Sequence, residues 1–271
     1  GGGFADHLAA LYASHGYAVV SLAYFGVESL PNELINIPLE YFENAITWIE
    51  RQPALETSRL AVAGVSRGGE LALLLASRYP VFKSVVAYVP SGYLWGAISQ
   101  SLDPNPDAFP SWSHHGVGLP YVARIRNDAA ALDDDGAVSL TPAYLAALND
   151  VERAEAAAID VERINGPILL IAGEADALWP SAHFSELIAA RLKARGFAHP
   201  VEVLSYEGAG HTIGPRYGPT TITQGFHGVR KVTIKMGGSP SAIAAAREDS
   251  WERALAFLEV NARTAAAAVA G

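Results

Sequence analysis

Cysteine is absent from all 271 residues of the chain. Its absence excludes disulfide bonds, thiolate metal sites and a cysteine nucleophile, so any covalent catalysis must use an oxygen or nitrogen nucleophile. A protein without disulfides also fits the reducing cytoplasm, and we therefore predict a cytoplasmic location.

Basic residues and long apolar runs are also scarce. The chain has 19 Lys and Arg against 28 Asp and Glu, a formal charge of −9, and a pI of about 5.3. This balance, without a basic cluster, argues against a nucleic-acid partner. The longest apolar runs, such as 167–172, are far shorter than the roughly 20 residues of a membrane-spanning helix. We expect no membrane span, and the sequence gives no prediction of oligomeric state.

The most informative motif that is present is Gly64-Val65-Ser66-Arg67-Gly68. The apolar segment 60–65 runs into it, and an apolar helical segment follows directly. A G-x-S-x-G motif between a strand and a helix is typical of a nucleophile elbow, where the serine lies on a strained turn and the glycines avoid a clash. We therefore predict Ser66 as a nucleophile. The alternative is a glycine-rich turn that holds an ordinary serine.

Strand and helix patterns alternate along the chain, which predicts an α/β fold with a mostly parallel sheet flanked by helices. We expect an Ala-rich tail that is frayed or disordered over 264–271. The predicted strands are 17–25, 60–65, 82–89, 167–172 and 201–206, and the predicted helices are 4–15, 39–49, 70–78, 183–193 and 242–260.

We predict one catalytic domain over 1–271, with a lid or cap insertion over about 93–165, where the alternation lapses. The chain opens on a glycine loop directly before a helix, so the central strand expected to lead into that loop is missing. Without it, two central strands would carry unpaired backbone. We therefore expect a C-terminal part of a longer polypeptide. The alternative is a rearranged sheet.

A nucleophilic serine needs a base, and the base needs an orienting carboxylate. A buried strand leads to a turn with Glu174 and Asp176, and the next strand ends in a glycine loop before His211. The chain order Ser66, Asp176, His211 is the one expected when the serine lies on such an elbow. Glu174 stays open as the alternative acid.

The remaining histidines lack a strand-end glycine context, and we expect them at the surface. The pair His114-His115 lies in the lid segment, where a substrate contact is the alternative. We expect no metal, because the sequence contains no H-x-x-x-H or H-E-x-x-H pair. We also predict no cofactor.

Backbone N–H groups that stabilise an oxyanion are predicted at two places. The first is Arg67, at a helix N-terminus, and the second is the loop with Gly2 and Gly3. The alternative for that loop is a flexible remnant of a purification tag. In the lid segment, Trp95, Trp112 and Tyr121 are candidate substrate contacts. The alternative for these aromatic residues is that they pack the lid together.

Further motifs extend over nearly the whole chain. They are Ala18–Gly26, Leu30-Pro31, Leu39–Glu43, Gly64–Leu71, Ile164–Asp176 with Trp179, Gly208–His211, Gly237–Pro240 and Asp249–Trp251. In these motifs the chain resembles the C-terminal α/β-hydrolase domain of the acyl-CoA thioesterase and bile acid-CoA:amino acid N-acyltransferase family. The resemblance implies an α/β-hydrolase fold, and activated acyl substrates, typically coenzyme A thioesters. It also implies an N-terminal β-sandwich domain, which this sequence does not contain.

The resemblance implies Ser66 as nucleophile, His211 as base and Asp176 as its partner. Family members that conjugate bile acids carry cysteine at the elbow, so Ser66 points to water as the acceptor. We therefore predict a serine hydrolase that cleaves acyl thioesters through an acyl-serine intermediate, with a small-molecule acyl ester or acyl-CoA as its partner. The alternatives are a carboxylesterase, an acyl-CoA:amino acid N-acyltransferase and, in another class, a non-catalytic ligand-binding homologue, which usually has a broken triad.

Overall fold

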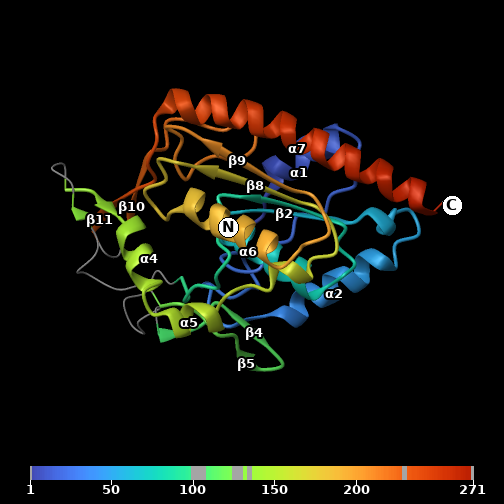
Figure 1. The fold of residues 1–271 in the computed structure, drawn as a ribbon, viewed down its shortest axis with the longest axis horizontal. Helices are drawn as coiled ribbons and strands as arrows, with labels where there is room; N and C mark the ends of the chain where they lie inside the picture. Colours follow the sequence, from blue (N-terminus) through green and yellow to red (C-terminus); the bar gives the residue numbers. More distant parts are fainter. Residues whose placement is uncertain (1, 99–107, 124–130, 133–135, 228–230, 270–271) are drawn as a thin grey trace. The chain divides into compact units, whose positions relative to one another are not determined.

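The computed structural model describes residues 2–98, 108–123, 131–132, 136–227 and 231–269 (Figure 1). The contacts divide the chain into two compact units. The first unit comprises Gly1–Thr57, Tyr93–Ile125 and Ala147–Ala158. The second unit comprises Ser58–Gly92, Arg126–Ala146 and Ile159–Gly271. No helix in the described part of the chain is both long and apolar enough to cross a bilayer.

A parallel sheet forms the centre of the second unit. Its strands lie in the order β2-β3-β8-β9, and each neighbouring pair is parallel. Both middle strands are buried along their whole length, as the continuous apolar runs of parallel sheets require. The strand bounds are β2 (Ala61–Val65), β3 (Ser84–Tyr88), β8 (Ile168–Gly173) and β9 (Val201–Tyr206).

Three helices of the second unit pack against this sheet (Figure 1). They are α3 (Arg67–Arg78), α6 (Ser181–Ala194) and α7 (Pro240–Val269). Helix α3 contacts β2 and β3, and residues 71–76 in it are all buried. The prediction of a mostly parallel sheet flanked by helices is confirmed.

Short elements complete the second unit. A small sheet has the order β10-β11-β7-β6. Its strands are β6 (Ala131–Leu132), β7 (Val138–Ser139), β10 (Gln224–His227) and β11 (Val232–Lys235). Helix α4 spans Thr141–Ala147, and its last residue belongs to the first unit. The 3₁₀ helices are η1 (Thr57–Arg59) and η3 (Val161–Arg163).

The first unit is built around aromatic residues. The rings of Tyr24, Phe42 and Trp112 lie with centroids 5.6 to 6.2 Å apart, and all three side chains are buried. A small sheet of this unit has the order β1-β4-β5, and helix α2 contacts its strands β1 and β4. The bounds are α1 (Asp6–Ser14), β1 (Ile37–Pro38), α2 (Leu39–Glu50), β4 (Trp112–His114), β5 (Val117–Gly118) and α5 (Val151–Ala156).

The predicted strand over 17–25 was wrong. Among the residues that the structure describes the segment has no strand pairing, and Val19 and Val20 are 38% and 45% exposed. Apolar β-formers give a local preference, but a strand also needs a neighbour for its backbone groups. Within the described residues, β2 pairs with β3 on one side only, and residues 2–5 before α1 form no strand.

The predicted unstructured tail was also wrong where the structure describes it. Helix α7 continues to Val269, well past the expected end at Val260. Alanine has the highest helix propensity, so the Ala-rich run after Thr264 favours continuation of the helix. Residues 270–271 lie outside the described part. The lid predicted over 93–165 contributes segments to both units, and its role as a lid stays a prediction.

Candidate active site

Ser66 lies in the one-residue turn between β2 and α3, at the carboxyl edge of the parallel sheet. Its backbone has φ 59° and ψ −122°, a conformation that few residues other than glycine adopt. The Ser66 N–H donates to the Tyr88 carbonyl at 2.9 Å, and the Ser66 carbonyl accepts from the Glu70 N–H at 3.0 Å. The turn is therefore held on both sides, by the neighbouring strand and by the first turn of the helix.

Gly64 makes this turn possible. A Cβ atom at position 64 would lie 2.0 Å from the Gly68 carbonyl oxygen, which is backbone and cannot rotate away. The first glycine of the motif is therefore required by the close approach of strand and helix, as the sequence motif predicts.

The side chains of Ser66, His211 and Asp176 lie in hydrogen-bond contact. His211 Nε2 lies 2.8 Å from Ser66 Oγ, and His211 Nδ1 lies 2.9 Å from Asp176 Oδ2. Asp176 and His211 are buried, whereas Ser66 is half-buried. All three come from the second unit, from the ends of β2 and β8 and from the loop after β9. Glu174, the alternative acid, is exposed.

Both oxygens of the buried Asp176 carboxylate accept hydrogen bonds. Its Oδ1 accepts from the backbone N–H groups of Leu178 at 3.0 Å and Trp179 at 3.2 Å. Its Oδ2 accepts from the Ser181 hydroxyl at 2.7 Å in addition to the His211 contact. These donors fix the carboxylate and compensate its loss of hydration. No sequence motif marks Ser181, which lies at the N-terminus of α6.

His211 is held from two sides. Its N–H donates to the Met236 carbonyl at 2.8 Å, and its ring lies edge-on to Trp179 with centroids 5.7 Å apart. Gly237 follows Met236 in the chain and has φ 78°, and a Cβ atom at this position would lie 1.9 Å from the Ala175 carbonyl oxygen. The segment after β11 therefore needs glycine to fit between the Asp176 turn and the His211 loop.

Arg67, the predicted oxyanion residue, is the first residue of α3. Backbone N–H groups in the first turn of a helix are not used by the helix's own hydrogen bonds, and they carry the positive end of its dipole. The Arg67 side chain forms a buried ion pair with Glu70, with Nη1 2.6 Å from Oε2. Gly2 and Gly3 belong to the first unit, and their part in an oxyanion hole stays a prediction.

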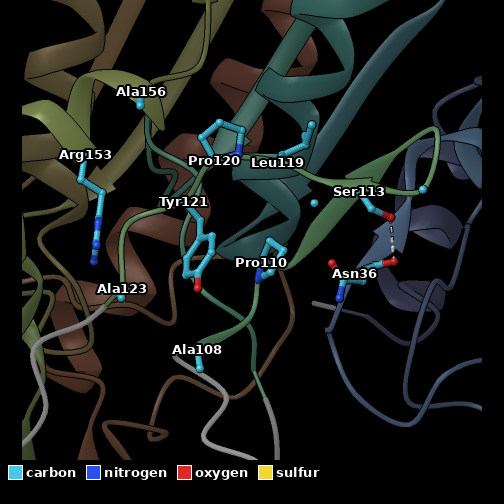
Figure 2. Close-up of a pocket in the computed structure, with 12 residues that line it drawn as sticks. Asn36, Ala108, Pro110, Ser113, Leu119, Pro120, Tyr121, Ala123, Arg153 and Ala156 are labelled. Carbon is cyan, nitrogen blue, oxygen red and sulfur yellow. Dashed lines mark hydrogen bonds between the residues drawn. The ribbon is translucent and has the colours of Figure 1, made fainter.

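The predicted substrate contacts belong to the first unit. Trp95 and Trp112 are each 1% exposed, and this burial favours the packing role that the sequence left open. Tyr121 lines a cavity of about 1,110 Å³ (Figure 2). Its wall includes Pro110, Ser113 and Arg153, all from the first unit. The contact of Tyr121 with a substrate stays a prediction.

One group of side chains in the described residues could hold a metal ion. It consists of Glu40, His114 and His115, whose ligand atoms lie within 4.8 Å of one another. The expectation of no metal rests on the absence of the motifs H-x-x-x-H and H-E-x-x-H, and neither motif describes this group. The group joins α2 to the β4–β5 turn.

The parallel sheet, its flanking helices and the strand–turn–helix at Ser66 define the class of protein, an α/β hydrolase fold. A family model described as "BAAT / Acyl-CoA thioester hydrolase C terminal" matches residues 37–263. This chain belongs to that family, and the resemblance seen in its motifs is confirmed.

The alignments with two curated relatives each cover 95% of this chain. Mouse "Acyl-coenzyme A thioesterase 2, mitochondrial" is 30% identical over 257 residues, which are 52% of its own length. Mouse "Peroxisomal succinyl-coenzyme A thioesterase" is 29% identical over 264 residues, which are 57% of its length. The chain thus spans about half the length of the curated relatives it matches.

Solved structures show weaker similarity. A Pyrococcus horikoshii acylaminoacyl peptidase covers 81% of this chain and 27% of its own, with 14% identity and a TM-score of 0.47. The α/β hydrolase GrgF from Penicillium sp. covers 76% of each chain, with 15% identity and a TM-score of 0.45. At this level neither similarity carries an argument about the chain.

Proposed function

We propose that this chain is a serine hydrolase that cleaves acyl thioesters of the coenzyme A type through an acyl-serine intermediate. The observation that carries the proposal is the hydrogen-bonded series Ser66–His211–Asp176 at the carboxyl edge of the sheet. Membership of the family supports the substrate class, because curated relatives that match most of this chain are named acyl-coenzyme A thioesterases.

In the proposed first step, Ser66 Oγ attacks the thioester carbonyl carbon while His211 Nε2 takes the hydroxyl proton. The tetrahedral intermediate then collapses, the carbon–sulfur bond breaks, and the imidazolium returns its proton to the departing thiolate. A water molecule, deprotonated by His211, attacks the acyl-serine ester in the second step. The carboxylic acid leaves, and Ser66 regains its proton.

Asp176 has the role of holding the imidazole in one tautomer. With Oδ2 at 2.9 Å from Nδ1, the ring carries its proton on Nδ1 and presents the lone pair of Nε2 to Ser66. The hydrogen bonds from Leu178, Trp179 and Ser181 keep the carboxylate in place during the cycle. The proposed oxyanion donors are the backbone N–H of Arg67 and an N–H of the loop with Gly2 and Gly3.

The reaction is tested by comparing substrates that share one acyl group. The rates of hydrolysis of a coenzyme A thioester and of a p-nitrophenyl ester with the same acyl group are measured for the unaltered protein and for Ser66→Ala. The proposal expects a higher kcat/KM for the thioester and a loss of about 10³-fold or more in kcat in the variant. Retention of most activity by Ser66→Ala would refute the mechanism, and a preference for the p-nitrophenyl ester would favour a carboxylesterase.

The acceptor is tested in the same assay with added glycine or taurine. The proposal expects free acid as the product, because the nucleophile is Ser66. Amide products would favour the acyltransferase alternative. A cytoplasmic location also stays a prediction, because the names of the relatives include a mitochondrial and a peroxisomal protein.

A further inference from the structure

We propose that Glu40, His114 and His115 form a binding site for a divalent transition-metal ion, for which Zn²⁺ is the probe. The site lies in the first unit and is separate from the residues of the proposed hydrolysis. The proposal rests on the backbone pairing, on the chemistry of the three side chains and on a buried carboxylate oxygen that lacks a partner among the described residues.

The backbone brings the three residues together. Strand β1 pairs in parallel with β4, with Ile37 opposite Trp112 and Pro38 opposite Ser113. The chain continues from β1 into α2 and from β4 into the turn before β5, so Glu40 and His115 each lie two residues beyond the last paired residues, Pro38 and Ser113. The His115 N–H donates to Glu40 Oε1 at 2.5 Å, and this hydrogen bond closes the arrangement.

The turn places both imidazoles on one side. Consecutive residues of a strand point to opposite faces, but His115 has φ 51° and leaves the strand conformation. The rings of His114 and His115 consequently lie with centroids 4.0 Å apart and planes 30° apart. His115 Nδ1 is 3.2 Å from Glu40 Oε1, so both kinds of ligand atom point to one place.

Glu40 has an unused ligand atom. Its Oε2 is buried and has no hydrogen-bond partner within the described residues, which is an unfavourable state for a carboxylate oxygen. A bound cation would satisfy this oxygen.

The ligand types select the class of ion. Two imidazoles and one carboxylate suit Zn²⁺ and its neighbours, whereas Mg²⁺ and Ca²⁺ prefer oxygen ligands only. Around a tetrahedral zinc, with bonds of about 2.0–2.2 Å, ligand atoms lie about 3.3 Å apart. The ligand atoms here lie within 4.8 Å, and the His115 side chain, 77% exposed, can rotate to close the difference.

A second carboxylate supports the site from behind. Glu43 lies on α2 three residues after Glu40, and its Oε1 is 3.3 Å from His114 Nε2. A metal-binding histidine commonly donates its other ring nitrogen to a carboxylate, which fixes the tautomer and the ring orientation. A bound ion would then link α2 to the β4–β5 turn and stabilise the first unit.

The test is a calorimetric titration of the metal-stripped full chain with ZnCl₂. The proposal expects one Zn²⁺ per chain, with a Kd in the micromolar range or tighter and a rise in Tm on binding. Glu40→Gln and His115→Ala are each expected to weaken binding about tenfold or more. His115 is exposed, so its variant keeps the fold, which circular dichroism of the metal-free proteins verifies.

His183→Ala is the matched control. His183 is also an exposed histidine beside a glutamate, with Nδ1 4.0 Å from Glu186 Oε2, but it lies on α6 in the second unit. This variant is expected to bind zinc as the unaltered chain does. Full zinc affinity in His115→Ala and Glu40→Gln, an equal loss in His183→Ala, or binding no tighter than millimolar would each overturn the proposal.

Discussion

The two units each contain a contact between a histidine and a carboxylate, and the two contacts differ most in burial. His211 Nδ1 lies 2.9 Å from Asp176 Oδ2, with side chains 8% and 0% exposed. His115 Nδ1 lies 3.2 Å from Glu40 Oε1, with side chains 77% and 33% exposed. Distance alone does not distinguish these pairs.

What surrounds each pair does distinguish them. The Asp176 carboxylate accepts from Leu178, Trp179 and Ser181, and His211 lies between this carboxylate and the Ser66 hydroxyl. Within the part of the chain that the structure describes, the Glu40 carboxylate has one oxygen without a partner, and two imidazoles lie beside the carboxylate. The first arrangement suits the transfer of a proton, and the second suits the binding of a cation.

The largest expected effect in the buried pair comes from Asp176→Asn. An amide at this position favours the wrong imidazole tautomer, so kcat should fall by about 10³–10⁴-fold while the fold is kept. The measurement is steady-state hydrolysis of the coenzyme A thioester, with circular dichroism to check folding. Glu186→Gln, at the exposed His183 pair on α6, is the matched control and should leave kcat unchanged. An Asp176→Asn variant with more than a tenth of the original kcat would contradict the role proposed for the carboxylate.

The buried ion pair beside Ser66, the proposed nucleophile, comes next, with an effect on stability. Arg67 and Glu70 are 4% and 0% exposed, with 2.6 Å between Nη1 and Oε2. Glu70→Gln removes the charge that compensates Arg67, and should lower the free energy of unfolding by about 3–5 kcal/mol. Urea denaturation measures this change. A loss below about 1 kcal/mol would show that the pair behaves like an exposed one.

Ser181→Ala tests the support of the Asp176 carboxylate, whose catalytic role is proposed. It removes the hydroxyl that donates to Asp176 Oδ2 at 2.7 Å. A hydrogen bond to a charged group contributes about 1.5–3 kcal/mol, and we expect a loss of stability in that range with a fall of a few-fold in kcat and an unchanged KM. A change in KM alone would indicate that Ser181 acts on substrate binding instead.

The smallest effect belongs to a partly exposed pair in the second unit. Arg191 donates to both oxygens of Glu162 at 2.8 Å, and these hydrogen bonds lower the pKa of the Glu162 carboxyl. A lowered folded-state pKa contributes stability above the ordinary value of 4.5 and loses it as the pH falls. Glu162→Gln should therefore cost up to about 1 kcal/mol at neutral pH. The difference from the unaltered chain should disappear towards about pH 3, and a difference that grows in acid would contradict this assignment.

Features with a local cause were predictable from the sequence. Strand β9 was predicted with the bounds that the structure has, and α2 ends within one residue of its prediction, because hydrophobic periodicity and flanking turns encode both. The contact of Ser66, Asp176 and His211 followed from another general rule. The carboxyl ends of neighbouring parallel strands meet at one edge of a sheet, and each of these residues comes shortly after such an end.

Features that depend on a distant partner were not predictable. Residues 17–25 have the composition of a strand, but strand formation depends on a neighbour that the segment does not have in the described structure. The approach of Gly237 to the Asp176 turn and the register of β1 with β4 are contacts across many residues. Strands of two and three residues leave no periodic signal, so the group of Glu40, His114 and His115 was invisible in the sequence.

We propose that His211 and Asp176 activate the Ser66 hydroxyl, and labelling with a fluorophosphonate is the sharpest test of this activation. The probe forms a covalent bond only with an activated hydroxyl, and peptide mapping by mass spectrometry then locates the adduct. We predict one adduct per chain, on Ser66, and its absence in His211→Ala. An adduct on another residue, or a folded and unaltered chain that remains unlabelled, would show that the Ser66 hydroxyl is not activated.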